Sequence, residues 1–342
     1  MTRPVVINGR FQRQPLSGVQ RTAREIVARL AAPHRVATPP SGMAPQMGHL
    51  WEQMVLPVRL GESLLWSPCN AGPLAARRHV VTIHDAAVLD HPEWFSARFS
   101  AIYRQLWPRL ARSAKIVTVS EFSRERLSEQ LDLPAERIAV VPNGVDARFA
   151  PATPDEIADV RQRYGLGEHL YFLALATVEP RKNLSLVLKA WRRALKDIPD
   201  ARLVIAGAKG VSRVFAGAEE HETPPGIIML GRTPDEDLPA LISGARAMLY
   251  PSLYEGFGLP VLEAMACGTP AVTTRRASLP EVGGEAAIYV DAKDEEDLAT
   301  ALVDLAGDDD IVADHREAGL ARAKQFSWDR AARSMEQIFA AY

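Results

Sequence analysis

Short apolar runs alternate with segments of helical periodicity along the whole chain. In the first half, apolar β-branched runs predict strands at residues 5–7, 80–83, 116–119 and 138–141. Between some of them, apolar positions recur at helical spacing in residues 19–32 and 121–131. Because continuous apolar strands separated by helices are typical of a parallel sheet covered on both faces, the first half predicts one doubly wound α/β unit.

A second series of the same kind follows a proline-containing connection at residues 149–154. Its predicted strands are residues 171–176, 202–206, 227–230, 247–250 and 271–273. We therefore expect two Rossmann-like domains, residues 1–150 and 151–326, and a closing helix over residues 327–342 that packs back on the N-terminal domain. Since open parallel sheets bind ligands at their carboxyl strand ends, we expect the domains to face a central cleft.

The composition fits an enzyme of two packed domains. The 342 residues exceed what one hydrophobic core usually organises, and 47% hydrophobic with 24% charged residues excludes disordered and collagen-like chains. Two distant cysteines, Cys69 and Cys267, favour neither a zinc site nor a redox pair. The longest nearly uninterrupted apolar run, residues 171–178, is eight residues, against about 20 needed to cross a bilayer. The amino terminus lacks the features of a signal peptide, so we expect a cytoplasmic protein.

The charge is divided unevenly between the two halves. Residues 1–150 carry 19 Lys and Arg against 12 Asp and Glu, a net +7, whereas the remainder carries 21 against 30, a net −9. Of the 19 basic residues 18 are Arg, which binds phosphate oxygens through forked hydrogen bonds. This half has either an ordinary solvated surface or a surface for an anionic partner such as a lipid diphosphate or acidic headgroups.

Two cations stand where the predicted strand 171–176 passes into a helix. Pro180 stiffens that turn, Arg181 and Lys182 follow it, and Asn183 suits the N-cap of the helix. Unpaired helix amides beside a fork-shaped and a point-like cation favour a diphosphate site. The alternative is a solvated basic pair.

A more specific pattern follows the strand 247–250. Gly256 and Gly258 permit close approach of the backbone to a ligand, and Pro260 suits the first turn of a helix. Glu255 precedes this turn and Glu263 follows eight residues later, so two carboxylates can accept hydrogen bonds from the hydroxyls of one ligand. The alternative is helix caps and surface charges.

Together these strings, with the Val-Pro-Asn-Gly-Val-Asp run at residues 141–146, resemble the retaining nucleotide-sugar glycosyltransferases of family four, which have the GT-B fold. The resemblance implies a donor held by the C-terminal domain. Arg181 and Lys182 would neutralise its diphosphate, Glu263 would bind the ribose hydroxyls, and Glu255 would hold the transferred sugar or, alternatively, act as a nucleophile. Other donor-binding positions implied by the resemblance are Gly256, Phe257, Gly258 and Leu259 around the helix start, and, less specifically, Gly207, Lys209, Gly231 and Arg232 beside the base.

The resemblance also assigns roles in the N-terminal domain. The loop 9–21 would close over the donor phosphate and border the acceptor, with Gly18 as the close-approach residue and Arg10, Arg13, Gln20 and Arg21 on the acceptor side. His84 resembles the family's histidine near the reacting sugar, although a histidine at a strand end is often structural. Asp85 would either orient His84 or cap the next segment.

The resemblance implies transfer of a hexose with retention of configuration, and the loops at Gly18 and at residues 178–183 resemble those of bacterial polysaccharide mannosyltransferases. GDP-mannose is the first donor candidate and a UDP-hexose the second, with a glycan or polyprenyl-diphosphate-linked saccharide as acceptor in bacterial cell-surface polysaccharide synthesis. The aspartates Asp308 to Asp310 are predicted to be a helix cap rather than metal ligands, so we expect no metal. We also expect no cofactor and no nucleic acid partner. The rival functions are a nucleotide-sugar epimerase, a sugar phosphorylase and a non-catalytic nucleotide-sugar sensor.

Residues 94–112 combine an apolar stripe with arginines. Phe95, Phe99, Ile102, Leu106 and Leu110 share one helical stripe, which predicts a core face. Trp94, Trp107 and four arginines then remain for other faces, a combination suited to a lipid interface. The alternative is a core face with solvated arginines. With the +7 half, this pattern suggests peripheral contact with an anionic membrane at the inner face of the cell membrane.

Overall fold

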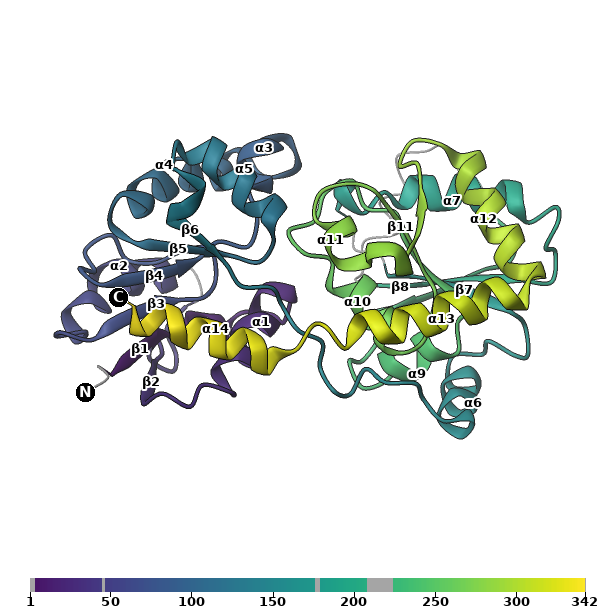
Figure 1. The fold of residues 1–342 in the computed structure, drawn as a ribbon, viewed down its shortest axis with the longest axis horizontal. Helices are drawn as coiled ribbons and strands as arrows, with labels where there is room; N and C mark the ends of the chain where they lie inside the picture. The colour runs from purple at the N-terminus through teal and green to yellow at the C-terminus, as the bar shows by residue number, and fades with distance from the viewer. Residues whose placement is uncertain (1–3, 45–46, 176–178, 208–223, 342) are drawn as a thin grey trace. The chain divides into compact units, whose positions relative to one another are not determined.

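The computed structural model describes residues 4–44, 47–175, 179–207 and 224–341. The chain divides into two compact units, one formed by Met1–Gly144 with Phe326–Tyr342 and the other by Val145–Gln325. Each unit contains a six-stranded sheet whose neighbouring strands all run parallel (Figure 1). In the described part of the chain no helix is both long enough and apolar enough to cross a membrane.

The sheet of the first unit has the strand order β2-β1-β3-β4-β5-β6. Its strands are β1 (Val5–Asn8), β2 (His34–Ala37), β3 (Leu64–Ser67), β4 (His79–Thr82), β5 (Lys115–Thr118) and β6 (Ile138–Val140). Its helices are α1 (Gly18–Val27), α2 (Gly48–Met54), α3 (Ala87–Asp90), α4 (Ala97–Ser113), α5 (Glu121–Leu131) and α14 (Trp328–Ala340). Chain order reverses between β1 and β3, which is where open α/β sheets bind ligands.

The strand register shows which helices share a face of this sheet. Val6 pairs with Leu65, Leu65 with His79, and Val81 with Ile116, so these side chains project from one face. On that face Leu65 packs with Trp51 of α2, and Val81 packs with residues of α4 and α5. On the other face Trp66 lies 5.6 Å from Phe339 of α14 between ring centroids. Figure 1 likewise shows α1 and α14 on one side and α2, α4 and α5 on the other.

The sheet of the second unit has the order β12-β11-β10-β7-β8-β9. Its strands are β7 (Tyr171–Leu175), β8 (Arg202–Ala206), β9 (Ile227–Gly231), β10 (Ala247–Tyr250), β11 (Ala271–Thr274) and β12 (Ile288–Val290). Its helices are α6 (Pro154–Arg163), α7 (Leu184–Ala194), α9 (Leu238–Ser243), α10 (Leu259–Ala266), α11 (Leu279–Gly283), α12 (Glu295–Gly307) and α13 (Asp309–Ala323). The order reverses between β7 and β10, so the two loops singled out in the sequence flank this switch point.

The last helix, α14, belongs to the first unit. The backbone amides of Ala31 and Ala32 each donate to Oε1 of Glu336 at 2.7 Å. A Cβ atom on Gly144 would lie 2.1 Å from the amide nitrogen of Trp328, so the segment before the second unit and the start of α14 pack backbone to backbone.

The core stripe predicted within residues 94–112 is only partly correct, since Leu110 is buried and Phe95 and Leu106 pack against the core, but Phe99 and Ile102 do not. In α4 the buried face contains Tyr103, Trp107 and Leu110, whereas Phe99 and Ile102 are 42% and 45% exposed. Trp107 is 1% exposed and its indole nitrogen donates to the carbonyl of Asn70 at 2.7 Å. The largest aromatic side chain fills the core because its one donor finds a partner there, and this turns the stripe predicted as core partly toward solvent.

Candidate functional site

Two loops of the second unit are tied together where β7 and β10 end. The amide of Leu253 donates to the carbonyl of Arg181 at 2.8 Å. Asn183 has a φ of 55°, and its side-chain amide donates to the carbonyls of Pro251 at 3.1 Å and Ala292 at 2.8 Å. Asn183 occupies the N-cap position of α7, but its side chain makes no capping hydrogen bond. The predicted N-cap position of Asn183 is therefore confirmed, and its side chain braces the neighbouring loops instead of capping the helix.

The braced loops bring three predicted site residues into one cluster. Nζ of Lys182 lies 2.7 Å from Oε1 of Glu255, and Nη1 of Arg181 lies 3.1 Å from Oε2 of the same carboxylate. Tyr250, the last residue of β10, donates from its hydroxyl to Oε1 of Glu255 at 2.9 Å and also contacts Lys182. Glu179 pairs with the Nε of Arg181. Two cations and a carboxylate thus meet at the switch point of the sheet.

Burial and charge together set the ionisation of this cluster. Burial by itself would raise the pKa of Glu255, which is 5% exposed, but the charges of Lys182 and Arg181 hold that pKa below its usual range. Burial also lowers the pKa of Lys182, and the adjacent Glu255 opposes this shift. The pKa of Tyr250 is raised well above its usual value, mainly by burial and then by the Glu255 charge. At neutral pH Glu255 is therefore an anion and Tyr250 a neutral donor.

The loop after Glu255 leads directly into α10. Gly258 has a φ of 100° and occupies the N-cap position, and Leu259 and Pro260 begin the helix. Gly256 and Phe257 lie buried between Glu255 and this helix start, and the hydroxyl of Ser278 donates to the carbonyl of Glu255 at 2.9 Å. Glu263 lies on α10 and is 6% exposed. The predicted donor-binding residues from Gly256 to Glu263 thus belong to one buried loop and helix.

The weaker predictions at β8 and β9 are only partly described. The amide of Gly207 donates to the carbonyl of Gly231 at 2.7 Å, which joins the carboxyl ends of β8 and β9. Arg232 follows and is exposed. Lys209 lies outside the described residues.

In the first unit a 3₁₀ helix, η1 (Gly9–Arg13), follows β1. Arg10 is held by Glu52 of α2, with Nε 3.4 Å from Oε1, and by His49, whose Nε2 accepts from Nη1 at 3.0 Å. Glu52 is fully buried and also accepts from Asn8 at 2.5 Å. Its pKa is lowered because His49, Arg10 and Asn8 together outweigh the effect of burial.

The other acceptor-side predictions lie on or near α1. Gly18 is the first residue of α1 and is exposed, as is Arg13 in η1. Gln20 donates to the side chain of Gln14 at 2.9 Å, and Arg21 is half-buried. These residues share the loop and helix that follow β1.

His84 follows β4 and is 5% exposed. Its Nε2 donates to the carbonyl of Pro68 at 2.9 Å, and its backbone amide donates to Oδ1 of Asn70 at 2.8 Å. Burial lowers the pKa of His84, so the ring is neutral at pH 7. Asp85 accepts from the amide of Ala87, the first residue of α3, at 3.0 Å, and the N-cap of that helix is Ala86.

Sequence reasoning missed Tyr250 and Glu52. Tyr250 carries a detectable signal, because it is a polar residue at the end of a buried strand five positions before Glu255. Glu52 carries none, since only the fold brings α2 under the end of β1. Asp308 accepts from the amides of Asp310 and Ile311, as predicted for a helix cap. Among the described residues no group of three or more His, Cys, Asp and Glu side chains is placed to hold a metal ion.

The comparisons with known proteins agree on one family. Residues 157–325 match glycosyl transferases group 1, and residues 62–149 match glycosyltransferase family 4. O-antigen chain mannosyltransferase B of Escherichia coli is 37% identical over 261 residues, which are 75% of this chain and 68% of that protein. Serotype-specific mannosyltransferase WbdA of Escherichia coli is 27% identical over 258 residues, 73% of this chain, but the match spans only 32% of that longer protein.

Solved structures show the same architecture. Anabaena HepE, crystallised with UDP and glucose, aligns with a TM-score of 0.78 at 19% identity and covers 99% of this chain and 100% of its own. The glycosyltransferase WaaG aligns with a TM-score of 0.75 at 16% identity over 98% and 99% of the two chains. With the matches in sequence, these findings confirm the predicted fold and enzyme class: the chain belongs to glycosyltransferase family 4, group 1, and has the GT-B fold.

Proposed function

We propose that the chain transfers mannose from GDP-mannose to a glycan or polyprenyl-diphosphate-linked saccharide, with retention of configuration, in cell-surface polysaccharide synthesis. The observation that carries the proposal is the buried carboxylate of Glu255 held between Lys182 and Arg181 at the switch point. The choice of donor is supported by the names of three relatives. Two are O-antigen and serotype-specific mannosyltransferases, and a third, from Mycolicibacterium smegmatis, is GDP-mannose-dependent, 32% identical over 69% of this chain and 64% of its own length.

The two cations stabilise the leaving group in this proposal. Cleavage of the sugar–phosphate bond develops negative charge on the diphosphate, and preorganised cations stabilise that charge most effectively in a site that excludes water. Glu179, a carboxylate partner of Arg181, is 49% exposed, and such exposed ion pairs are weak, so a diphosphate oxygen can exchange for this carboxylate. Lys182 is 12% exposed and its Nζ is fixed by Glu255 and Tyr250. The diphosphate then replaces Glu179 on Arg181 while Lys182 stays in place.

Glu255 positions the sugar rather than attacking it. Its carboxylate is ionised at neutral pH and already accepts from three donors, so a sugar hydroxyl can exchange with one of them. We assign the ribose hydroxyls to Glu263 and the base to the ends of β8 and β9. The acceptor side comprises η1, the start of α1 and His84, and the leaving phosphate removes the acceptor proton.

A polyprenyl-diphosphate-linked acceptor resides in a membrane. We therefore place the protein at the inner face of the cell membrane as a peripheral protein. The net +7 of residues 1–150 favours that location over one away from acidic lipids.

A panel of nucleotide-sugars tests the proposal. The full chain is incubated with GDP-mannose or UDP-hexoses, and thermal stabilisation, nucleotide release and the released sugar are measured. GDP-mannose is expected to give the largest stabilisation, and Lys182→Ala is expected to lower turnover by about 10²-fold or more. Lys189→Ala, an exposed lysine of α7, is the control and is expected to change neither. A larger effect of a UDP-hexose would assign the donor differently, and isomerised sugar without transfer would indicate an epimerase.

A further inference from the structure

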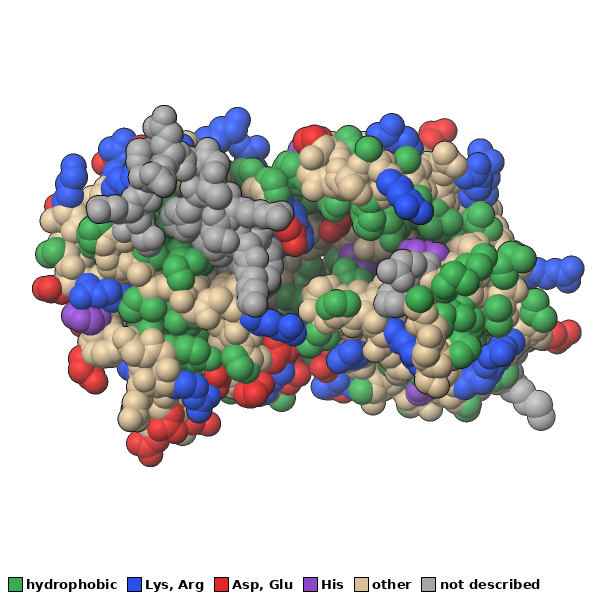
Figure 2. All heavy atoms as spheres, turned by 180° about the vertical axis from the view of Figure 1, so that it is seen from behind, with side chains coloured by type: hydrophobic (Ala, Val, Ile, Leu, Met, Phe, Trp, Pro, Cys, Tyr) green, Lys and Arg blue, Asp and Glu red, His purple; other side chains and the backbone are tan. Residues whose placement is uncertain are grey.

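A basic side chain at the surface does not by itself identify a site. Lysines and arginines are scattered over the face of the molecule shown in Figure 2, among acidic and hydrophobic side chains. Arg10 differs from an ordinary surface arginine, because only 11% of its side chain is exposed and neighbouring side chains hold its guanidinium. Its carboxylate partner, Glu52 of α2, is fully buried. A carboxylate buried so completely is costly unless its charge is paired, so Glu52 and Arg10 depend on each other.

Three side chains form a closed ring of contacts around this pair. Oε1 of Glu52 lies 3.4 Å from Nε of Arg10, and Oε2 lies 3.3 Å from Nδ1 of His49. The ring closes where Nε2 of His49 accepts from Nη1 of Arg10 at 3.0 Å. Because the guanidinium is planar and contacts a partner at two of its nitrogens, the ring fixes its orientation as well as its position.

The carboxylate of Glu52 is itself anchored to the sheet. Asn8, the last residue of β1, donates to Oε1 of Glu52 at 2.5 Å, and its Oδ1 accepts from the backbone amide of Arg10 at 3.3 Å. The same side-chain amide of Asn8 donates to Oγ of Ser67 at 3.3 Å, and Nε2 of His79 lies 2.9 Å from that hydroxyl. These contacts reach β1, β3 and β4. Glu52 therefore cannot move without disturbing several buried polar groups.

Arg10 lies where the first sheet is expected to bind ligands. It follows β1, beside the point where chain order reverses between β1 and β3. Residues 9–24, which form η1 and most of α1, contain four arginines and neither Asp nor Glu. A ligand that approaches this segment therefore meets positive charge, which favours an anionic group.

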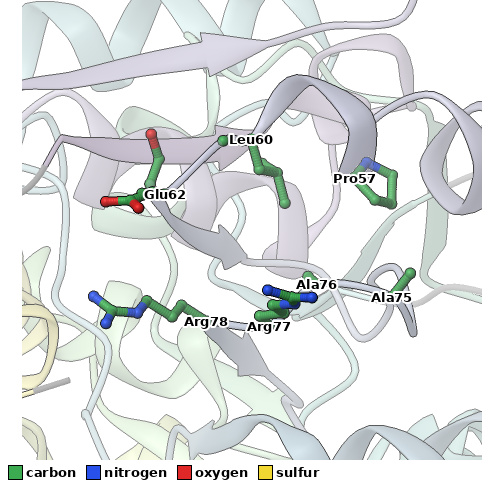
Figure 3. Close-up of a pocket in the computed structure, with 9 residues that line it drawn as sticks. Pro57, Leu60, Glu62, Ala75, Ala76, Arg77 and Arg78 are labelled. Carbon is green, nitrogen blue, oxygen red and sulfur yellow. The ribbon is translucent and has the colours of Figure 1, made fainter.

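Other arginines of the first unit lie at the opposite edge of the sheet. Arg77 and Arg78 line a hollow of about 520 Å³ together with Glu62 (Figure 3). Arg77 and Arg78 precede β4, whereas Arg10 follows β1, and the strands of this sheet run parallel. The hollow is thus at the amino edge, away from the edge that binds ligands. Its exposed Arg77 and Glu62 are suitable controls for Arg10 and Glu52.

We propose that Glu52 is a positioning residue for the acceptor, because it fixes Arg10 in the orientation in which the guanidinium binds a phosphate oxygen of the acceptor. This role rests on the proposed function, in which the acceptor carries a diphosphate. An arginine has five N–H donors, and Glu52 and His49 use only part of them. A guanidinium that is already held in place loses little freedom on binding. Glu52 lies too deep to contact a ligand, since none of its side chain is exposed.

Transfer kinetics with two acceptors test this role in the full chain. One acceptor is a saccharide linked to a short prenyl diphosphate, and the other is the same saccharide without the diphosphate. Glu52→Gln and Arg10→Met are each expected to raise the KM for the first acceptor by about tenfold or more and the KM for the second by less than about twofold. Glu62→Gln and Arg77→Gln, in the hollow of Figure 3, are expected to change neither KM.

A double-mutant cycle separates positioning from a general effect on the fold. If Glu52 acts through Arg10, adding Glu52→Gln to Arg10→Met changes the KM for the diphosphate-linked acceptor by less than about twofold, whereas independent effects would multiply to about 100-fold. The double variant leaves no unpaired carboxylate in the core, so it is expected to unfold at a higher temperature than Arg10→Met alone. It therefore keeps the test valid if Arg10→Met folds poorly.

Binding of farnesyl diphosphate to the chain saturated with GDP needs no sugar transfer. GDP fills the donor site, so the titration measures a second diphosphate site. We expect Glu52→Gln to weaken this binding by about tenfold and to change the affinity for GDP by less than about twofold.

Four results would overturn the proposal. They are unchanged binding of farnesyl diphosphate by Glu52→Gln, equal increases in KM for both acceptors, multiplicative effects in the double variant, and a loss of affinity for GDP alone, which would assign Arg10 to the donor phosphate. If the original chain transfers no sugar but binds farnesyl diphosphate in a manner that depends on Glu52, the proposed function fails and the role of Glu52 in binding a diphosphate stands.

Discussion

Lys182 and Glu255 depend on each other for their charged states. Either charge alone in this environment would be costly to bury, because desolvation disfavours the ionised form of both groups. Paired at 2.7 Å, with Arg181 on the second carboxylate oxygen, they remain ionised and ready for a ligand that carries both charge and hydroxyls. The pair thus has structural and functional roles that mutation must separate.

Replacement of Lys182 by methionine tests the structural role. Met fills a similar volume but leaves Glu255 and Tyr250 without the ammonium group, so we expect the free energy of unfolding to fall by about 3 kcal/mol. Urea unfolding measures this change. Lys189→Met, at an exposed position of α7, is expected to stay within about 0.5 kcal/mol of the original chain. An equally small change for Lys182→Met would mean that the buried carboxylate is solvated or protonated.

We expect His79 to make the free energy of unfolding of the first unit fall as the pH is lowered. It is fully buried, Nε2 lies 2.9 Å from Oγ of Ser67, and burial lowers its pKa to about 3. The unfolded chain binds a proton near pH 6.5 while the folded chain does not, so stability is complete above pH 6.5 and is lost as pH falls toward 3. The loss is about 1.4 kcal/mol per pH unit, or about 2 kcal/mol at pH 5.

Urea unfolding at pH 7.5 and 5 tests the contribution of His79. His79→Gln is expected to flatten the pH dependence even if it lowers stability at both values, whereas His34→Gln, at an exposed histidine, is expected to leave the dependence unchanged. A pH slope retained in His79→Gln would assign the effect to other groups, of which His84 is the first to examine because burial lowers its pKa as well.

At the scale of elements, the start of α10 is set by one backbone conformation. Gly258 has a φ of 100°, and a Cβ atom there would lie 2.9 Å from Cδ2 of Leu279. We expect Gly258→Ala to lower the free energy of unfolding by about 1–2 kcal/mol and to reduce transfer, since the helix start must shift. Gly307→Ala at the end of α12 is the control, because a Cβ atom meets nothing there, and it is expected to be neutral or stabilising by up to about 1 kcal/mol. Full activity in Gly258→Ala would remove α10 from the donor site.

Most elements that depend on neighbouring residues could be predicted from the sequence, whereas features that depend on distant contacts could not. The strands at residues 171–175 and 247–250 are buried along their length and carry continuous apolar sequence, so they were predicted. Edge strand β2 is largely exposed and β12 has three residues, so neither has a clear pattern, and both were missed. The central strand β3 was missed as well, although its four residues are all buried. The rotation of α4 could not be predicted because it depends on Trp107 reaching a carbonyl 37 residues away. Likewise the charges of Arg181 and Glu255 were identified, but their mutual contact depends on the pairing of β7 with β10.

For the whole molecule, the division of the chain into two units makes the donor assignment testable without an acceptor. The cluster around Glu255, the helix start at Gly258 and Glu263 all belong to Val145–Gln325. Hydrogen exchange with GDP at about 100 times its dissociation constant is expected to slow exchange by up to about 100-fold in residues 179–183 and 250–263, because opening of these loops must first release the nucleotide. UDP at the same concentration is expected to protect them less, and residues 60–63 and 76–78, which precede β3 and β4 at the amino edge of the first sheet, are expected to be unchanged. Protection confined to the first unit, with none at residues 250–263, would place the nucleotide elsewhere and contradict every role assigned to Arg181, Lys182 and Glu255.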